Sequence, residues 1–179
     1  MEIGLVSELG ARLPRGGGLL GFGATEADAR RRLESLGRPA LAVAPFGRGG
    51  GGGGGGGGRG GGSWGWRARV GDRWVEASAG GDGLLGEIRV ARAIGVVVDD
   101  VVGVVGAAGA VVVDGAAGAS GIPVLYRGID LFDHSMAEVE FLLGATGGGG
   151  VRDLRLTGIS GYAQSVTLLD LTRPYSSSG

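Results

Sequence analysis

An unbroken run of glycine at residues 49–58 constrains this chain more than any other sequence feature. Glycine has no side chain to bury and loses more backbone freedom on folding than any other residue, so such a run favours flexible coil over a packed element. The chain has 44 glycines among 179 residues, against a usual share of about 7%. The sequence therefore predicts a glycine-rich loop at residues 47–62, with the core built from the rest.

Arginine–glycine tracts also occur in RNA-binding proteins, but only Arg48 and Arg59 punctuate this one and no aromatic residue lies within it. The charges are balanced, with 17 basic and 18 acidic side chains. A protein that binds through phosphate contacts normally has a basic excess or a dense basic patch. We therefore expect no nucleic-acid partner.

The chain contains no cysteine, which excludes disulfides, thiolate zinc sites and cysteine nucleophiles. Residues 1–6 lack the basic start and apolar run of a secretion signal. The apolar stretch 101–113 follows two aspartates and is shorter than the roughly 20 residues that cross a bilayer. We expect a cytoplasmic protein with no membrane partner and no cofactor.

The first half predicts one helix and four strands. Thr25, with acidic residues in the turn that follows it, predicts the start of a helix that ends near Gly37. Residues 3–6 predict a short strand. Alternation of apolar and charged side chains predicts an antiparallel meander with a tight turn at Gly71 and Asp72, and its strands are 66–70, 73–79 and 84–91.

A similar order recurs in the second half. Residues 122–126 predict a strand, and Ser135 with Glu138 forms a capping box that begins a helix. Two further strands are predicted at 151–157 and 162–171. The fold class is therefore α+β, with two similar small units, each a short helix packed on an antiparallel sheet. Agreement across several local signals favours duplication, with coincidence as the alternative.

These signals divide the chain into four parts. Residues 1–92 form the first unit, which contains the loop 47–62, and residues 93–121 form a low-complexity connector or strand. Residues 122–174 form the second unit, and 175–179 form a disordered tail.

The cap-and-helix blocks at 25–36 and 135–144 each begin with Thr or Ser, have an acidic group three residues later, and reach leucine followed by glycine where the helix ends. This pattern resembles that of repeats found in β-lactamase inhibitor proteins and small outer-membrane assembly lipoproteins. The resemblance covers about a dozen residues in each half. It implies a helix on a short antiparallel sheet and a protein that works by binding other proteins, and no binding residue carries over from it.

Aromatic and basic side chains gather on the first predicted hairpin. Trp64, Arg67, Arg69 and Arg73 are candidate binding residues, because tryptophan and arginine are enriched at binding hot spots. Alternation places Arg67 and Arg69 on the face opposite the buried stripe, Arg73 lies across the turn, and Trp64 lies at the edge. The alternative is that the tryptophans fill the core and the arginines are simply solvated.

The turn before the second helix carries Asp130, Asp133 and His134, the single histidine. These side chains are a second candidate binding site, or an acid–base or metal site of a small enzyme. A triad with Ser135 is disfavoured because adjacent residues do not align as nucleophile, base and orienting acid, and Ser135 already serves as a helix cap. One histidine with two carboxylates also lacks a recognised metal-ligand spacing.

The sequence thus predicts a non-catalytic protein-interaction module, an inhibitor or immunity-like protein for instance, whose partner is another protein. The alternative is a small enzyme that uses the turn at 130–134. The oligomeric state stays open.

Overall fold

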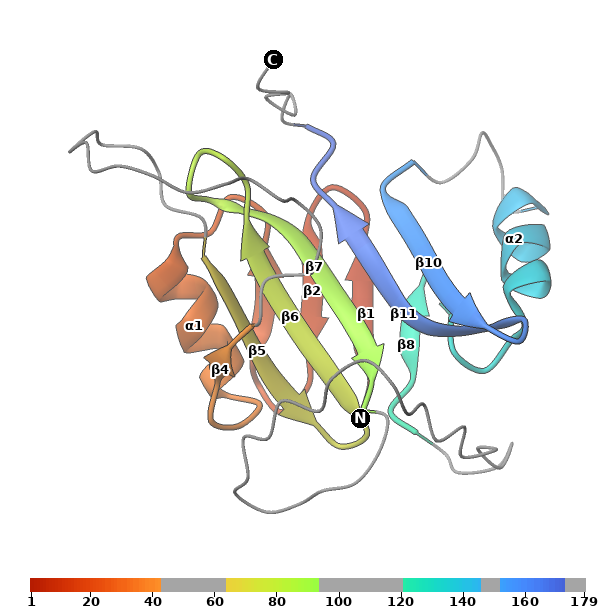
Figure 1. Ribbon diagram of the computed structural model, residues 1–179, viewed down its shortest axis with the longest axis horizontal. Coiled ribbons are helices and arrows are strands. Elements are labelled where there is room, and N and C mark those ends of the chain that lie inside the picture. The colour runs from red at the N-terminus through yellow and green to blue at the C-terminus, as the bar shows by residue number, and fades with distance from the viewer. Residues whose placement is uncertain (43–63, 94–120, 146–151, 173–179) are drawn as a thin grey trace, which may run out of the picture.

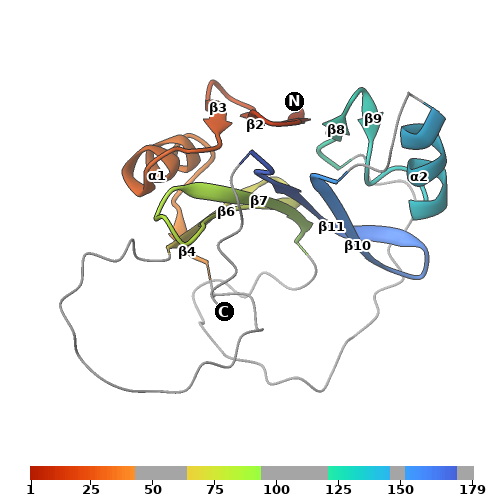
Figure 2. The same cartoon turned by 90° about the horizontal axis from the view of Figure 1, so that it is seen from above.

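The computed structural model of the chain describes residues 1–42, 64–93, 121–145 and 152–172. The loop predicted at 47–62, the tail at 175–179 and nearly all of the connector at 93–121 lie outside the described residues. The described part has two β-sheets stacked as layers, with one helix at each end (Figures 1 and 2). The predicted α+β class is confirmed.

Sheet A contains β1 (Ile3–Val6), β2 (Gly10–Leu13), β3 (Gly18–Gly21), β8 (Val124–Tyr126) and β9 (Ile129–Asp130), in the order β3-β2-β1-β8-β9. Strands β1 and β8 run parallel, and the other neighbours are antiparallel. The β8–β9 turn consists of Arg127 and Gly128, with φ of 52° and 81°. Two consecutive positive φ values characterise the primed turns that suit tight hairpins.

Sheet B contains β4 (Ala40–Leu41), β5 (Gly65–Val70), β6 (Arg73–Ala79), β7 (Leu85–Arg92), β10 (Leu154–Ile159) and β11 (Tyr162–Leu169). Its order is β10-β11-β7-β6-β5-β4, and every neighbouring pair is antiparallel. The predicted meander is therefore confirmed as β5, β6 and β7. Gly71 has φ of 57° in the β5–β6 turn, which glycine adopts without a steric penalty.

Each sheet takes strands from both halves of the chain, which corrects the expectation of one sheet per unit. β8 and β9 extend sheet A beyond β1, and β11 joins β10 to β7 in sheet B. The pairings that do this, β1 with β8 and β7 with β11, connect segments more than 70 residues apart, which local patterns do not reveal. Apart from the two-residue strand β4, an order of hairpin, helix and hairpin does recur, as β2–β3, α1, β5–β6 and as β8–β9, α2, β10–β11. Duplication itself stays a prediction.

Both helices begin at the predicted caps. In α1 (Glu26–Glu34) the Thr25 hydroxyl accepts a hydrogen bond from the Asp28 backbone N–H at 3.3 Å. Before α2 (Met136–Ala145) the Ser135 hydroxyl accepts from the Glu138 N–H at 3.2 Å, and a Glu138 carboxylate oxygen accepts from the Ser135 N–H at 2.9 Å. This reciprocal pair is a capping box.

No helix in the described part of the chain is long and apolar enough to cross a membrane.

The hydrophobic core lies between the two sheets. Ile3, Leu20 and Tyr126 are fully buried on the inner face of sheet A, and Val75 and Ile88 are fully buried on that of sheet B. Because side chains alternate along a strand, the residues between these buried ones point out of the sandwich. We call the side of sheet B that points away from sheet A the outer face.

Candidate functional site

The outer face of sheet B begins with Arg67 and Arg69 on β5. Ala68 and Val70 are fully buried between the sheets, whereas Arg69 is exposed and Arg67 is half-buried. The structure therefore places both arginines opposite the buried stripe, as alternation predicts.

Strand pairing aligns Arg67 with charged and polar residues of four other strands. Arg67 lies opposite Glu76, Glu76 opposite Arg89, Arg89 opposite Thr167, and Thr167 opposite Arg155. These five residues form one row across β5, β6, β7, β11 and β10. With neighbouring strands about 4.8 Å apart, the row spans about 19 Å.

Arg67 is held flat on the outer face by Trp74. Its guanidinium lies 4.8 Å from the centre of the Trp74 ring, within the range of a cation–π contact. Trp74 pairs with Arg69 in the register, so both arginines of β5 border this indole. No described residue accepts a hydrogen bond from the buried Arg67 Nε.

Arg89, in the middle of the row, is engaged within the sheet. Its Nη1 lies 3.5 Å from Glu76 Oε2, and its Nη2 donates to Ser165 Oγ at 3.2 Å. Glu87, on the same side of β7, has its pKa raised, chiefly by burial, with Arg155 and Arg89 opposing the rise. The outer face thus has a basic excess among its described residues, namely Arg67, Arg69, Arg89 and Arg155 against Glu76 and Glu87.

Arg73 does not belong to this face, which corrects the prediction that it extends the arginine patch. It opposes Val70 in the register and points between the sheets, where it is 4% exposed. Its guanidinium pairs with Asp72 and lies 4.7 Å from the centre of the Phe132 ring. Burial lowers the Arg73 pKa, and the charge of Asp72 opposes that effect.

Trp64, the residue before β5, packs toward the core, which corrects its predicted place at the edge of the arginine patch. Its indole Nε1–H donates to the Gly83 carbonyl oxygen at 2.7 Å, and its ring packs against the core. Trp66 lies on the same side, donating to Glu26 Oε1 at 2.9 Å under the guanidinium of Arg30. The alternative of a core role holds for Trp64 and Trp66, and Trp74 is the tryptophan of the outer face.

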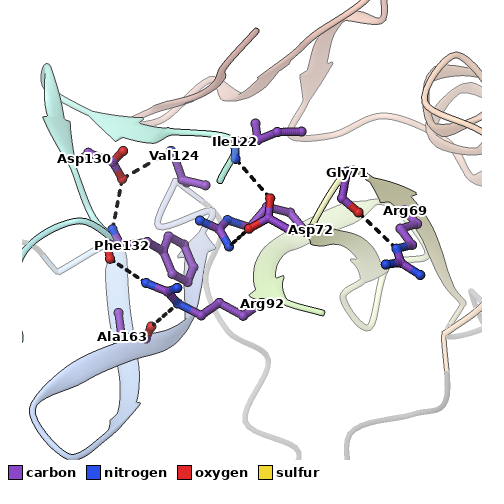
Figure 3. A network of polar contacts seen from close by, with 10 residues as sticks. Arg69, Gly71, Asp72, Arg92, Ile122, Val124, Asp130, Phe132 and Ala163 are labelled. Atoms are coloured by element: carbon purple, nitrogen blue, oxygen red, sulfur yellow. Dashed lines mark hydrogen bonds and ion pairs between the residues drawn. The ribbon is translucent and has the colours of Figure 1, made fainter. Parts of the chain in front are cut away.

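The turn at residues 130–134 contributes mainly to the fold. Asp130 Oδ1 accepts hydrogen bonds from the Phe132 N–H at 3.0 Å and the Val124 N–H at 3.4 Å, as Figure 3 shows. Asp133 is exposed and His134 is half-buried. Within the described residues, no three His, Asp or Glu side chains gather in a way that could hold a metal ion.

Four residues of the outer face are absent from the candidates predicted from the sequence, namely Trp74, Glu76, Arg89 and Arg155. The signal for the first three was present, because alternation along 73–79 and 84–91 already directs them outward. Arg155 joins the row only through the pairing of β10 with β11 and of β11 with β7. That pairing is a tertiary feature without a local sequence signature.

The chain has no significant match among protein-family models, curated proteins or solved structures. The resemblance to the inhibitor and lipoprotein repeats stays a prediction. The candidate site therefore stands on its own geometry.

Proposed function

We propose that this protein is a non-catalytic binding module whose partner is another protein, and that it binds that partner with the outer face of sheet B. The observation that carries the proposal is the row from Arg67 to Arg155 with Trp74 beside it. Tryptophan and arginine are the side chains most enriched at binding hot spots. No described helix packs over this face (Figure 2).

The arrangement of the arginines supports recognition more than stability. A core arginine is normally paired and buried, as Arg73 is. Arg69 instead is exposed, and among described residues its side chain donates only to the Gly71 carbonyl oxygen, at 3.0 Å through Nε. Its two terminal nitrogens are therefore available to a carboxylate, which arginine can bind in a bidentate manner.

The size of the face indicates a modest affinity. A row of about 19 Å and a seven-residue strand of about 23 Å enclose roughly 440 Å². Standard interfaces bury about 800 Å² on each partner. Ile159 and Tyr162, 66% and 52% exposed at the end of the β10–β11 hairpin, enlarge the available apolar surface. We expect a transient complex, or one that also covers this hairpin.

Site-specific photo-crosslinking tests the proposal. A benzophenone amino acid is placed at Arg69 or at Thr157, both exposed on the outer face, and at Arg12, exposed on the far side of sheet A, as the matched control. In cells of the source organism, the same protein should be captured from Arg69 and Thr157 and not from Arg12. Capture from Arg12 alone would contradict the proposal.

A fourth position, His134, tests the alternative site. Capture from His134 without capture from Arg69 or Thr157 would move the interface to the turn at 130–134. Turnover that is lost in His134→Ala, with the melting curve unchanged, would favour the enzymatic alternative.

A further inference from the structure

The arginines of the outer face divide into engaged and available groups. Arg89 is neutralised by Glu76 and bonded to Ser165. Arg67, Arg69 and Arg155 form no ion pair within 4.0 Å to any described residue. The available cations therefore lie at both ends of the row, with the paired one between them.

The spacing of Arg67 and Arg69 along β5 indicates how far apart the negative charges of a ligand should be. Arg67 and Arg69 are two residues apart on one strand and point to the same side, so their Cα atoms are about 6.7 Å apart. An extended segment places its own alternate side chains at the same interval. Carboxylates at alternating positions would therefore meet the two guanidinium groups in register.

The contact with Trp74 holds the Arg67 guanidinium in position before a ligand binds. The Arg67 guanidinium lies over its ring, and the buried Nε has no described acceptor. A pre-positioned guanidinium loses less side-chain freedom on binding than a solvated one. Arg67 is therefore suited to anchor an incoming carboxylate, with Arg69 as the adaptable second contact.

Resting on the proposed function, we infer that the partner presents an extended acidic segment, with carboxylates at every second residue, along β5 on the outer face. The basic excess of the face matches this charge. A nucleic acid would supply negative charge too. However, Glu76 and Glu87 interrupt the positive charge of the face, and its described residues form no row of exposed aromatic side chains on which bases could stack.

The test uses the full chain and defined probes. A fluorescent peptide that alternates glutamate with threonine over eight residues is compared with the same peptide carrying glutamine in place of glutamate. A single-stranded oligonucleotide of eight thymidines is the third probe. Affinity is measured by fluorescence anisotropy at low and moderate salt. We expect the glutamate peptide to bind at least about tenfold more tightly than the glutamine peptide, with the difference shrinking as salt rises.

Two charge reversals assign the binding to a face. Arg67→Glu combined with Arg69→Glu should weaken binding of the glutamate peptide at least about tenfold, as loss of charge-assisted contacts predicts. Arg12→Glu, on an exposed strand residue of sheet A, should leave it within about twofold. Circular dichroism spectra should be the same for all three proteins. The double variant should melt at a lower temperature, because it removes the contact of Arg67 with Trp74 and places a carboxylate opposite Glu76, so binding is measured well below that temperature.

Several outcomes would overturn the inference. One is equal binding of the glutamate and glutamine peptides, and another is peptide binding that survives the double reversal. Tighter binding of the oligonucleotide, lost in the double variant, would assign the face to nucleic acid. Concentration-dependent dimerisation that the double variant abolishes would assign it to a second copy of this chain. If crosslinking from Arg69 and Thr157 succeeds while the peptide test fails, the proposed function stands and only the acidic segment is wrong.

Discussion

The guanidinium of Arg73 lies 4.7 Å from the centre of the Phe132 ring, in a site where Arg73 is 4% exposed and Phe132 is 3% exposed. Arg73 opens β6 in the first half of the chain, and Phe132 lies between β9 and α2 in the second. Arg92 approaches the same ring at 5.3 Å and donates to the Phe132 carbonyl oxygen at 2.6 Å (Figure 3). Arg73 and Arg92, both from sheet B, thus contact the ring of Phe132, which belongs to the second half of the chain.

Arg73→Ala should therefore lower the free energy of unfolding by about 2 to 4 kcal/mol, because it removes a cation–π contact, buried packing and the partner of Asp72. Arg73→Lys should recover only part of this loss, since an ammonium group lacks the planar face that stacks on a ring. Urea denaturation measures both. Equal stability of Arg73→Ala and the wild type would show that this contact does not hold the halves together.

Asp153 links three segments through hydroxyl donors. Its carboxylate accepts hydrogen bonds from Ser7 Oγ at 2.6 Å and from the buried Tyr126 hydroxyl at 3.1 Å. Tyr126→Phe should cost about 1 to 3 kcal/mol of unfolding free energy, because a carboxylate that is 6% exposed loses a donor. Thr157→Ala, on an exposed strand position, is the control and should change stability by less than about 0.5 kcal/mol. Thermal or urea unfolding that shows no difference between the two variants would contradict this role of Asp153.

The capping box predicts an acid-dependent effect at α2. Hydrogen bonds from the Ser135 N–H and hydroxyl lower the Glu138 pKa below its ordinary value of 4.5. A lowered folded-state pKa means that the contribution to stability is present above pH 4.5 and is lost as pH falls through the folded-state pKa. Ser135→Ala should cost about 1 kcal/mol at neutral pH, and part of this cost should disappear in acid.

Melting temperatures of wild type and Ser135→Ala from pH 7 to pH 2.5 check this expectation. Glu138→Gln is the matched control, because glutamine keeps an acceptor for the Ser135 N–H and cannot titrate. A difference between wild type and Ser135→Ala that stays constant over the whole range would refute the link to Glu138.

For Glu87 we expect the opposite pH dependence of its contribution to stability. Burial raises its pKa above 4.5, so its contribution to stability is complete below pH 4.5 and is lost as pH rises through the folded-state pKa. Glu87→Gln should therefore melt at a higher temperature than the wild type at pH 7, and the advantage should vanish near pH 4. A neutral-pH melting temperature below that of the wild type would show that Arg155 and Arg89 outweigh the burial.

Local residue patterns were enough to predict several elements of this protein. The caps at Thr25 and Ser135, the glycine turn at Gly71 and the alternation along residues 66–91 depend on neighbours in the chain, and the structure confirms them. The outward direction of Arg67 and Arg69 followed from the same alternation. Strands β2 and β3 were missed because glycines at 16–18 and 21 obscure the alternation of so short a hairpin.

Tertiary structure decided how the halves combine and which charged side chains are buried. Arg73 has the same chemistry as Arg69, and it is buried because the pairing of β1 with β8 brings the chain that leads to Phe132 over the start of β6. The row from Arg67 to Arg155 exists because β11 pairs with β7, and the paired residues are 74 or more positions apart in the chain. Such pairings are selected by the packing of whole sheets against one another. The free energy of that packing is distributed over many contacts, so no single segment of the sequence predicts the pairing.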